Sequence, residues 1–366
     1  MFVHTDTKNV IMQSFRWSRR HLTAIIWNYP VLWECFLAYR KIKKFVAHRL
    51  GLKPPLSVVM LEPTNHCNLS CVMCGNHLQK RDKGYMAQET FDRFIQHLPG
   101  KPIDAICMFT VGEPLLHTKL AEFFNRIRTR ARERVLSTNA LLFLKDESLL
   151  EKLIRAGMNH LHCSGDGYDA ATYETVRING RFDDFLESLK RIRETRDRLN
   201  PEVVFELQYC LVNRHTLEEF DQVFRTYGEL VDEIVFKPLN NQANVKIPFR
   251  PSEEILGYKY YLSDAKSPCD WLWRGPTVLW DGRVSACCRN YCGELIMGHI
   301  DNSSLTDIWE SSAYQSLREA HIRGEPPQRC RGCCELQEED FSIWMMNRWI
   351  RKQLDRPDYT LYVAMR

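Results

Sequence analysis

The sequence predicts an α/β fold in three parts: an N-terminal helical segment, a partial (β/α)6 barrel of the TIM type, and a small cysteine-rich C-terminal domain. Three observations support this division. Residues 55–250 alternate short apolar runs with charged amphipathic stretches, a pattern typical of parallel strands joined by helices. Residues 1–54 mix basic residues with aromatic and aliphatic ones. Glycine and cysteine dominate from about residue 267 onward.

Six apolar runs in the barrel region are predicted strands. They cover residues 57–62, 104–109, 134–138, 160–164, 203–212 and 233–239. Five amphipathic stretches are predicted helices, at residues 91–98, 120–133, 146–157, 182–199 and 216–231. Parallel strands joined by right-handed helical crossovers form an open or closed barrel, whose ligands bind at the carboxyl ends of the strands. We therefore expect functional side chains directly after these strands.

Changes in composition set the remaining boundaries. We predict domains at residues 1–54, 55–250, 251–340 and 341–366. Within the third domain, the segment WDGRVSA predicts a β-hairpin, and residues 305–322 predict a single helix.

The first domain predicts one or two amphipathic helices interrupted near Pro30. The stretch from Thr23 to Tyr39 is too short to cross a bilayer, because a spanning helix needs about 20 mostly apolar residues. Two interpretations stay open: a helical cap packed on the barrel, or contact of residues 1–50 with a membrane surface. We expect a cytoplasmic protein, peripheral to the membrane in the second case.

The composition narrows the class of protein. With 366 residues and 44% hydrophobic content, the chain can bury a large core without disulfides, yet it has fourteen cysteines. Clustered cysteines in an intracellular protein are more often metal ligands than bridges. The net charge of +4 comes from the N-terminal segment, and no nucleic-acid-binding module is visible, so we expect no nucleic-acid partner.

Three closely spaced cysteines follow the first predicted strand: Cys67, Cys71 and Cys74, in the pattern C-x3-C-x2-C. Three thiolates suit a [4Fe-4S] cluster and leave one iron open to a non-protein ligand. Zinc is the rival, but structural zinc has four protein ligands, and His66 and His77 are poorly placed to supply the fourth.

At these cysteines the chain resembles the radical S-adenosylmethionine (SAM) superfamily, and the resemblance extends over roughly residues 55–334. It implies that the open iron is chelated by the amine and carboxylate of SAM. One electron, from a reductase such as flavodoxin or ferredoxin, then cleaves SAM to methionine and a 5'-deoxyadenosyl radical. That radical takes a hydrogen atom from the substrate.

The resemblance also implies a set of SAM-binding residues after the strands. Gly112, Glu113 and Pro114 match the element that binds the amine, and Arg177 matches the arginine that pairs with the carboxylate. A turn and an exposed helix arginine are the alternative interpretations. The further cofactor candidates are Ser137, Asn139, Ser164, Gln208 and Leu211, with Lys237 and Asn240 as weaker ones.

A second set of cysteines lies in the C-terminal domain: Cys269, Cys287, Cys330 and Cys333. Four thiolates can enclose a cluster completely. This region resembles the SPASM/twitch extension of radical SAM enzymes. The spacing from Cys269 to Cys287 and that from Cys330 to Cys333 match the single-cluster arrangement of butirosin-type aminocyclitol dehydrogenase, which implies one auxiliary [4Fe-4S] cluster. Zinc in the same site stays an alternative.

Cys288, Cys292 and Cys334 lie beside these ligands without an obvious metal role. One of them could replace a ligand. Alternatively, Cys288 or Cys292 could give a hydrogen atom to a substrate radical, as a cysteine is thought to do in the related neomycin-type epimerase. The alternative interpretation is that each of these cysteines is a small buried residue without a chemical role.

These features predict a radical SAM enzyme that dehydrogenates a sugar, cyclitol or aminoglycoside. A fully ligated auxiliary cluster has no iron for substrate, so electron transfer is its expected task. Three other hypotheses for the enzymatic activity stay open: a radical epimerase, an enzyme that modifies ribosomally made peptides, and an enzyme that acts on a lipid-linked substrate. The non-enzymatic alternative is an iron-sulfur or zinc-binding adaptor.

Overall fold

The computed structural model describes residues 49–212, 216–239, 254–255, 258–259 and 268–331, together with residues 39, 42, 45, 46, 333, 347 and 350–354. The chain divides into two compact units, residues 1–53 and 54–366. In the first unit, residues 39, 42, 45, 46 and 49 are helical. The predicted helices before residue 39 and the membrane-contact prediction for residues 1–50 lie almost entirely outside the described residues. None of the helices described is both long and apolar enough to span a bilayer.

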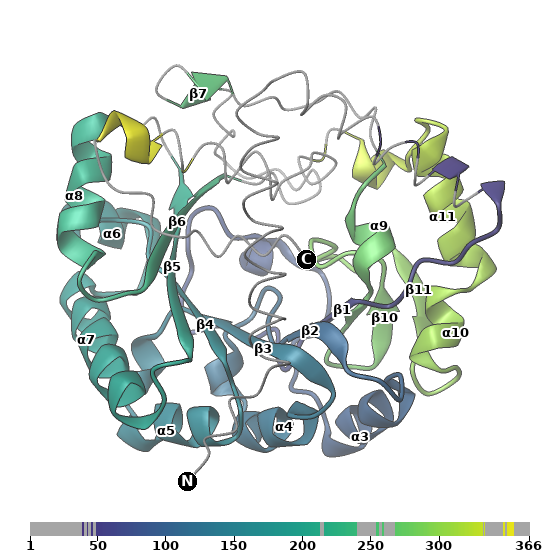
Figure 1. Ribbon diagram of the computed structural model, residues 1–366, viewed down its shortest axis with the longest axis horizontal. Coiled ribbons are helices and arrows are strands. Elements are labelled where there is room, and N and C mark those ends of the chain that lie inside the picture. Colours follow the sequence, from purple (N-terminus) through teal and green to yellow (C-terminus); the bar gives the residue numbers. More distant parts are fainter. Residues whose placement is uncertain are drawn as a thin grey trace, which may run out of the picture. The chain divides into compact units, whose positions relative to one another are not determined.

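Six parallel strands form the barrel part of the second unit, as predicted (Figure 1). They are β1 (Val58–Leu61), β2 (Ile103–Cys107), β3 (Ala131–Thr138), β4 (His160–Ser164), β5 (Val204–Leu211) and β6 (Glu233–Pro238). They lie side by side in chain order, each paired with the next. Parallel pairing in chain order places all six carboxyl ends at the same end of the barrel.

Helices connect the strands and cover their outer face (Figure 1). They are α3 (Gln88–His97), α4 (Leu120–Ile127), α5 (Glu147–Arg155), α6 (Ala170–Val176), α7 (Phe182–Leu199) and α8 (Leu217–Tyr227), with short 3-10 turns η1 (Gly75–Leu78), η2 (Pro114–Leu116) and η3 (Leu141–Leu144). The predicted helix over residues 120–133 was too long. It ends at Ile127, and Ala131 already pairs with Ile103 of β2.

Alternation along each strand separates the core from the barrel lumen. On β5, Leu207, Tyr209 and Leu211 belong to the main hydrophobic core beneath the helices. Because successive side chains point to opposite faces of a strand, Gln208 and Cys210 face the lumen. The lumen therefore receives the polar residues of β5.

The cysteine-rich region extends the same sheet. Its elements are α9 (Trp271–Arg274), β9 (Thr277–Val278), β10 (Arg283–Ser285), β11 (Ile296–His299), α10 (Leu305–Trp309), α11 (Ser312–Ile322) and η4 (Gln328–Cys330); the short pair β7 (Glu254–Ile255) and β8 (Tyr258–Lys259) precedes them. Strand β9 pairs in parallel with β1, so the sheet continues from the barrel into β10 and β11 (Figure 1). Gly275 makes this pairing possible, since a Cβ there would lie 1.5 Å from the Val58 carbonyl oxygen.

Two predictions for this region have different outcomes. The hairpin is confirmed: β9 and β10 are antiparallel, and Gly282 takes the left-handed backbone conformation (φ +86°) in the turn between them. The single helix over residues 305–322 is wrong. It is two helices, because the Ser311 hydroxyl accepts a hydrogen bond from the Tyr314 N–H and so begins a new helix.

Candidate active site

Cys67, Cys71 and Cys74 lie on the loop after β1, as expected for an active site at the carboxyl ends of barrel strands. The sulfur atom of each cysteine accepts a hydrogen bond. The backbone N–H groups of Leu69 and Asn76 donate to Cys67 and Cys74, at 3.5 and 3.4 Å, and the Arg177 guanidinium donates to Cys71 at 3.6 Å. An apolar shell that includes Leu69, Met73, Val176 and Val212 surrounds the three cysteines.

Burial changes the acidity of these thiols. It raises the pKa of Cys67 to about 12 and that of Cys74 to about 11, because the apolar shell disfavours a thiolate. Bound metal reverses this preference by coordinating the thiolates and releasing their protons. Three converging thiols that receive hydrogen bonds in an apolar shell therefore fit a [4Fe-4S] cluster, whose sulfurs accept such bonds.

Gly112, Glu113 and Pro114 form the GEP segment after β2. This segment packs directly against the loop that carries Cys67, Cys71 and Cys74, here called the cysteine loop. At Gly112 a Cβ would lie 2.1 Å from the Thr64 carbonyl oxygen, so only glycine fits this approach. The buried Glu113 carboxylate accepts hydrogen bonds from the Thr138 hydroxyl (2.7 Å) and from the N–H groups of Asn139 (2.8 Å) and Leu115 (3.1 Å). Glu113 thus joins the loops after β2 and β3. An ionised carboxylate has about four acceptor sites, so about one stays available for an ammonium group.

Arg177 lies at the end of α6, buried beside the cysteine loop. It forms an ion pair with Asp166, which in turn accepts a hydrogen bond from the Cys210 N–H at 2.7 Å. The Nε of Arg177 is buried and has no hydrogen-bond partner. A buried guanidinium N–H without a partner favours a bound anion, and the SAM carboxylate fits that requirement.

The other SAM-site candidates divide into two groups. Ser137, Asn139 and Ser164 lie at or directly after the carboxyl ends of β3 and β4, at the same end of the barrel as the cysteine loop. Gln208 pairs with Ser164 across β4 and β5 and so lies at the same level of the barrel, whereas the side chain of Leu211 points away from the lumen. The Gln208 amide is hydrogen-bonded to His162 and Glu206, and Leu211 is buried in the core on the outer face. Asn240 lies outside the described residues.

The four cysteines predicted for the second cluster are brought together. Cys269, Cys287, Cys330 and Cys333 line one small cavity in the C-terminal region, whose other walls include Leu272, Leu295 and Leu317. Burial raises the pKa of Cys330 to about 11. Four thiols around an enclosed apolar space are a donor set that fits an iron-sulfur cluster with no open coordination position.

His321, which was not predicted from the sequence, lines the same cavity. Its imidazole is buried, its Nε2 has no hydrogen-bond partner, and burial lowers its pKa to about 4. In the sequence it stands on a helix with no neighbouring cysteine, so no local pattern identifies it.

The loop that carries Cys288 and Cys292 reaches back to the first site. Arg81, which follows the cysteine loop, donates from Nε to the Tyr291 carbonyl at 2.8 Å. The Arg289 guanidinium is close enough to Cys74 to oppose the rise in its pKa. The Cys288 thiol is hydrogen-bonded to Cys287, a predicted cluster ligand. Cys334 lies outside the described residues.

Two family models match the two parts of the chain that carry these cysteines. The family model of the radical SAM superfamily matches residues 61–227, and that of the SPASM iron-sulfur cluster-binding domain matches residues 269–334. The chain therefore belongs to the radical SAM superfamily. It carries a C-terminal SPASM domain, and membership implies SAM, a [4Fe-4S] cluster in the barrel, and auxiliary iron-sulfur ligation in the SPASM domain.

Individual relatives are distant. A tungsten-containing aldehyde ferredoxin oxidoreductase cofactor-modifying protein from Pyrococcus furiosus is 22% identical over 309 residues, 72% of this chain and 83% of that protein. Among solved structures, SuiB of Streptococcus suis bound to the precursor peptide SuiA is 14% identical with a TM-score of 0.60, over 77% of this chain and 70% of that one. BtrN in complex with AdoMet and 2-DOIA is 17% identical with a TM-score of 0.50, over 77% of this chain and 93% of the BtrN chain. At these identities the structures establish the fold alone.

Proposed function

We propose that this protein is a radical SAM dehydrogenase that removes two electrons and two hydrogens from a sugar, cyclitol or aminoglycoside. The observation that carries the proposal is the set of four cysteine thiols around the SPASM cavity. When bound, SAM and the first cluster would supply a radical that takes a hydrogen atom; the substrate radical would then lose a proton to water, and a fully ligated second cluster would accept the remaining electron.

Residues of this chain have distinct roles in the proposal. Cys67, Cys71 and Cys74 would hold the first cluster. Arg177 would bind the carboxylate of SAM, and the GEP segment would bind its amine. Polar side chains of the lumen, among them Gln208 and Lys237, would contact a hydroxyl-rich substrate, because buried donors and acceptors need polar partners. The solved BtrN complex with 2-DOIA supports a small polar substrate.

A peptide substrate is the second candidate. The fold is also similar to that of SuiB, which was solved bound to the precursor peptide SuiA, with a TM-score of 0.60. Epimerisation is the third outcome. Since Cys288 is hydrogen-bonded to Cys287 and Cys292 lies close to Arg81, Cys292 is the better candidate for a hydrogen donor.

The substrate class can be tested with reconstituted protein. The protein is loaded anaerobically with iron and sulfide, mixed with SAM and dithionite, and supplied with sugar, aminocyclitol or peptide pools in deuterated water. We expect 5'-deoxyadenosine and a small polar product lighter by two mass units. A product heavier by one unit would instead show epimerisation through an exchangeable thiol, and modification confined to the peptide pool would overturn the small-molecule proposal.

Replacing Cys269 or Cys333 by alanine should remove the auxiliary cluster and leave the first one intact. We expect iron content to fall by roughly four atoms per chain, since each cluster is a four-iron cube. SAM cleavage should continue while substrate oxidation is lost. The matched control is Cys163→Ala, a buried cysteine of the outer core that should keep full iron. Unchanged iron in Cys269→Ala would contradict the ligand set, and zinc in place of iron would contradict the auxiliary cluster.

A further inference from the structure

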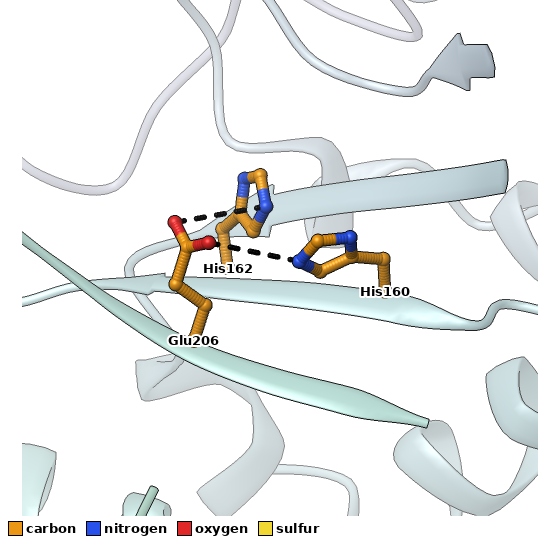
Figure 2. Close-up of side chains that lie close together, drawn as sticks. All are labelled: His160, His162 and Glu206. Atoms are coloured by element: carbon orange, nitrogen blue, oxygen red, sulfur yellow. Dashed lines mark ion pairs between the residues drawn. The ribbon is translucent and has the colours of Figure 1, made fainter. Parts of the chain in front are cut away.

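Two histidines and a glutamate face one another in the barrel lumen. His160 and His162 are two residues apart on β4, so both point to the same face, and Glu206 lies opposite His162 on the neighbouring strand β5. Figure 2 shows both imidazole rings directed at the Glu206 carboxylate. Their Nε2 atoms lie 3.7 Å (His160) and 3.8 Å (His162) from its oxygens.

These contacts are too long for hydrogen bonds, which join N and O at about 2.7–3.2 Å. The Nε2 atoms of His160 and His162 are buried and have no hydrogen-bond partner. Only 5% of His160 is exposed. Buried polar atoms without partners are costly and rare in native proteins, so two of them converging on one carboxylate indicate a group that fits between them.

The donor set identifies the chemistry of that group. One ligand atom from each of the three residues lies within 4.8 Å of the others. Two donors bound to one zinc ion at 2.0–2.1 Å in tetrahedral geometry are about 3.4 Å apart, close to the observed spacing. Two imidazole nitrogens and one carboxylate oxygen are ligands that zinc, iron(II) and similar ions share.

We propose that His160, His162 and Glu206 bind one divalent first-row transition-metal ion in the barrel lumen. The site is distinct from both cysteine sites and does not depend on the proposed dehydrogenation. Three protein ligands leave at least one coordination position for a hydroxyl or carbonyl oxygen of a lumen ligand, as in catalytic zinc sites.

Neighbouring side chains resemble the outer contacts of metal-bound histidines. Such histidines donate their second ring N–H to a carboxylate or carbonyl oxygen. His160 Nδ1 faces Glu133 at 4.0 Å, and His162 Nδ1 lies 2.7 Å from the Gln208 amide nitrogen. The same nitrogen also donates a hydrogen bond to Glu206 Oε1 at 2.8 Å. Gln208 therefore holds the His162 ring and the Glu206 carboxylate facing each other in the metal-free protein. With metal bound, the amide turns over so that its oxygen accepts the Nδ1 hydrogen.

Crystals of the holoenzyme, with both clusters loaded and zinc chloride added, locate the metal directly. Diffraction recorded on either side of the zinc and iron absorption edges distinguishes an ion in the lumen from cluster iron. We expect one anomalous peak among His160, His162 and Glu206. A water molecule there, or zinc bound only at cysteines, would overturn the proposal.

A zinc-binding assay on the same holoenzyme adds a measurement in solution. His162→Ala and Glu206→Gln should weaken zinc binding by more than about 100-fold, and Gln208→Leu by about 10- to 100-fold, the range typical of outer contacts. The matched control is Val135→Ala, because Val135 is paired with His160 across the strands and has no donor atom. Equal zinc affinity in His162→Ala and wild type would overturn the assignment even if every variant folds.

Discussion

Replacing Cys71 by alanine is expected to abolish formation of 5'-deoxyadenosine from SAM, a loss of more than about a thousandfold, or about 4 kcal/mol in the barrier. The reason is the ligand count. With three cysteines the cluster has one open iron, and with two it has too few protein ligands to persist. Cys71 is also the sulfur that receives the Arg177 guanidinium, so its loss separates the metal site from the proposed carboxylate-binding arginine. Anaerobic incubation with dithionite and SAM, followed by chromatography, measures the product.

Cys210→Ala is the matched control for this experiment. Cys210 packs against the same apolar cluster as the three cysteines but lies on β5, outside their motif. Its alanine variant should retain both iron and SAM cleavage. If Cys71→Ala still forms 5'-deoxyadenosine, the assignment of the first cluster is wrong. If neither variant binds iron, the cysteines act through folding rather than ligation.

The barrel could be predicted from the sequence because its signals are local. Each strand is a short apolar run between amphipathic helices, and the helix over residues 182–199 begins and ends where the pattern predicts. Errors arose where two local signals compete. Residues 131–133 continue a helical pattern, yet pairing with β2 places them in a strand, and the Ser311 cap divides a continuous amphipathic stretch.

Site residues, too, could be predicted where their signal is local in the sequence. The cysteine motif is compact in sequence, so the cluster site could be predicted, whereas the lumen group consists of two residues on one strand and one on the next. The alternating histidines of HLHCS were visible, but they gained meaning only when strand pairing brought Glu206 opposite His162. The parallel pairing of β9 with β1 was invisible for the same reason, because it joins residues more than 200 positions apart.

The second large effect is expected from Arg81→Met, which removes one partner of a buried ion pair. Arg81 donates from both terminal nitrogens to the Glu62 carboxylate, at 2.8 and 2.9 Å, and the Glu62 side chain is fully buried. Among the described residues, removing the cation leaves the buried charge with two weaker donors, the Thr110 hydroxyl and the Trp280 backbone N–H, and such a loss typically costs about 3–5 kcal/mol. We expect the melting temperature of the iron-loaded protein to fall by roughly 5–15 °C in circular dichroism.

Arg81 has a second consequence, because its Nε also holds the Tyr291 carbonyl of the SPASM loop. The variant should therefore loosen the segment between the two cysteine sites and lower substrate oxidation more than SAM cleavage. Arg132→Met is the control: its ion pair with Asp104 is largely exposed, and such pairs contribute only about 0–1 kcal/mol. The double variant Glu62→Gln/Arg81→Met should recover part of the lost stability, since no buried charge remains. If Arg81→Met and Arg132→Met melt at the same temperature, the ion pair does not stabilise this junction, and other contacts, among them the β1–β9 pairing and the Arg93–Asp301 ion pair, hold the SPASM domain to the barrel.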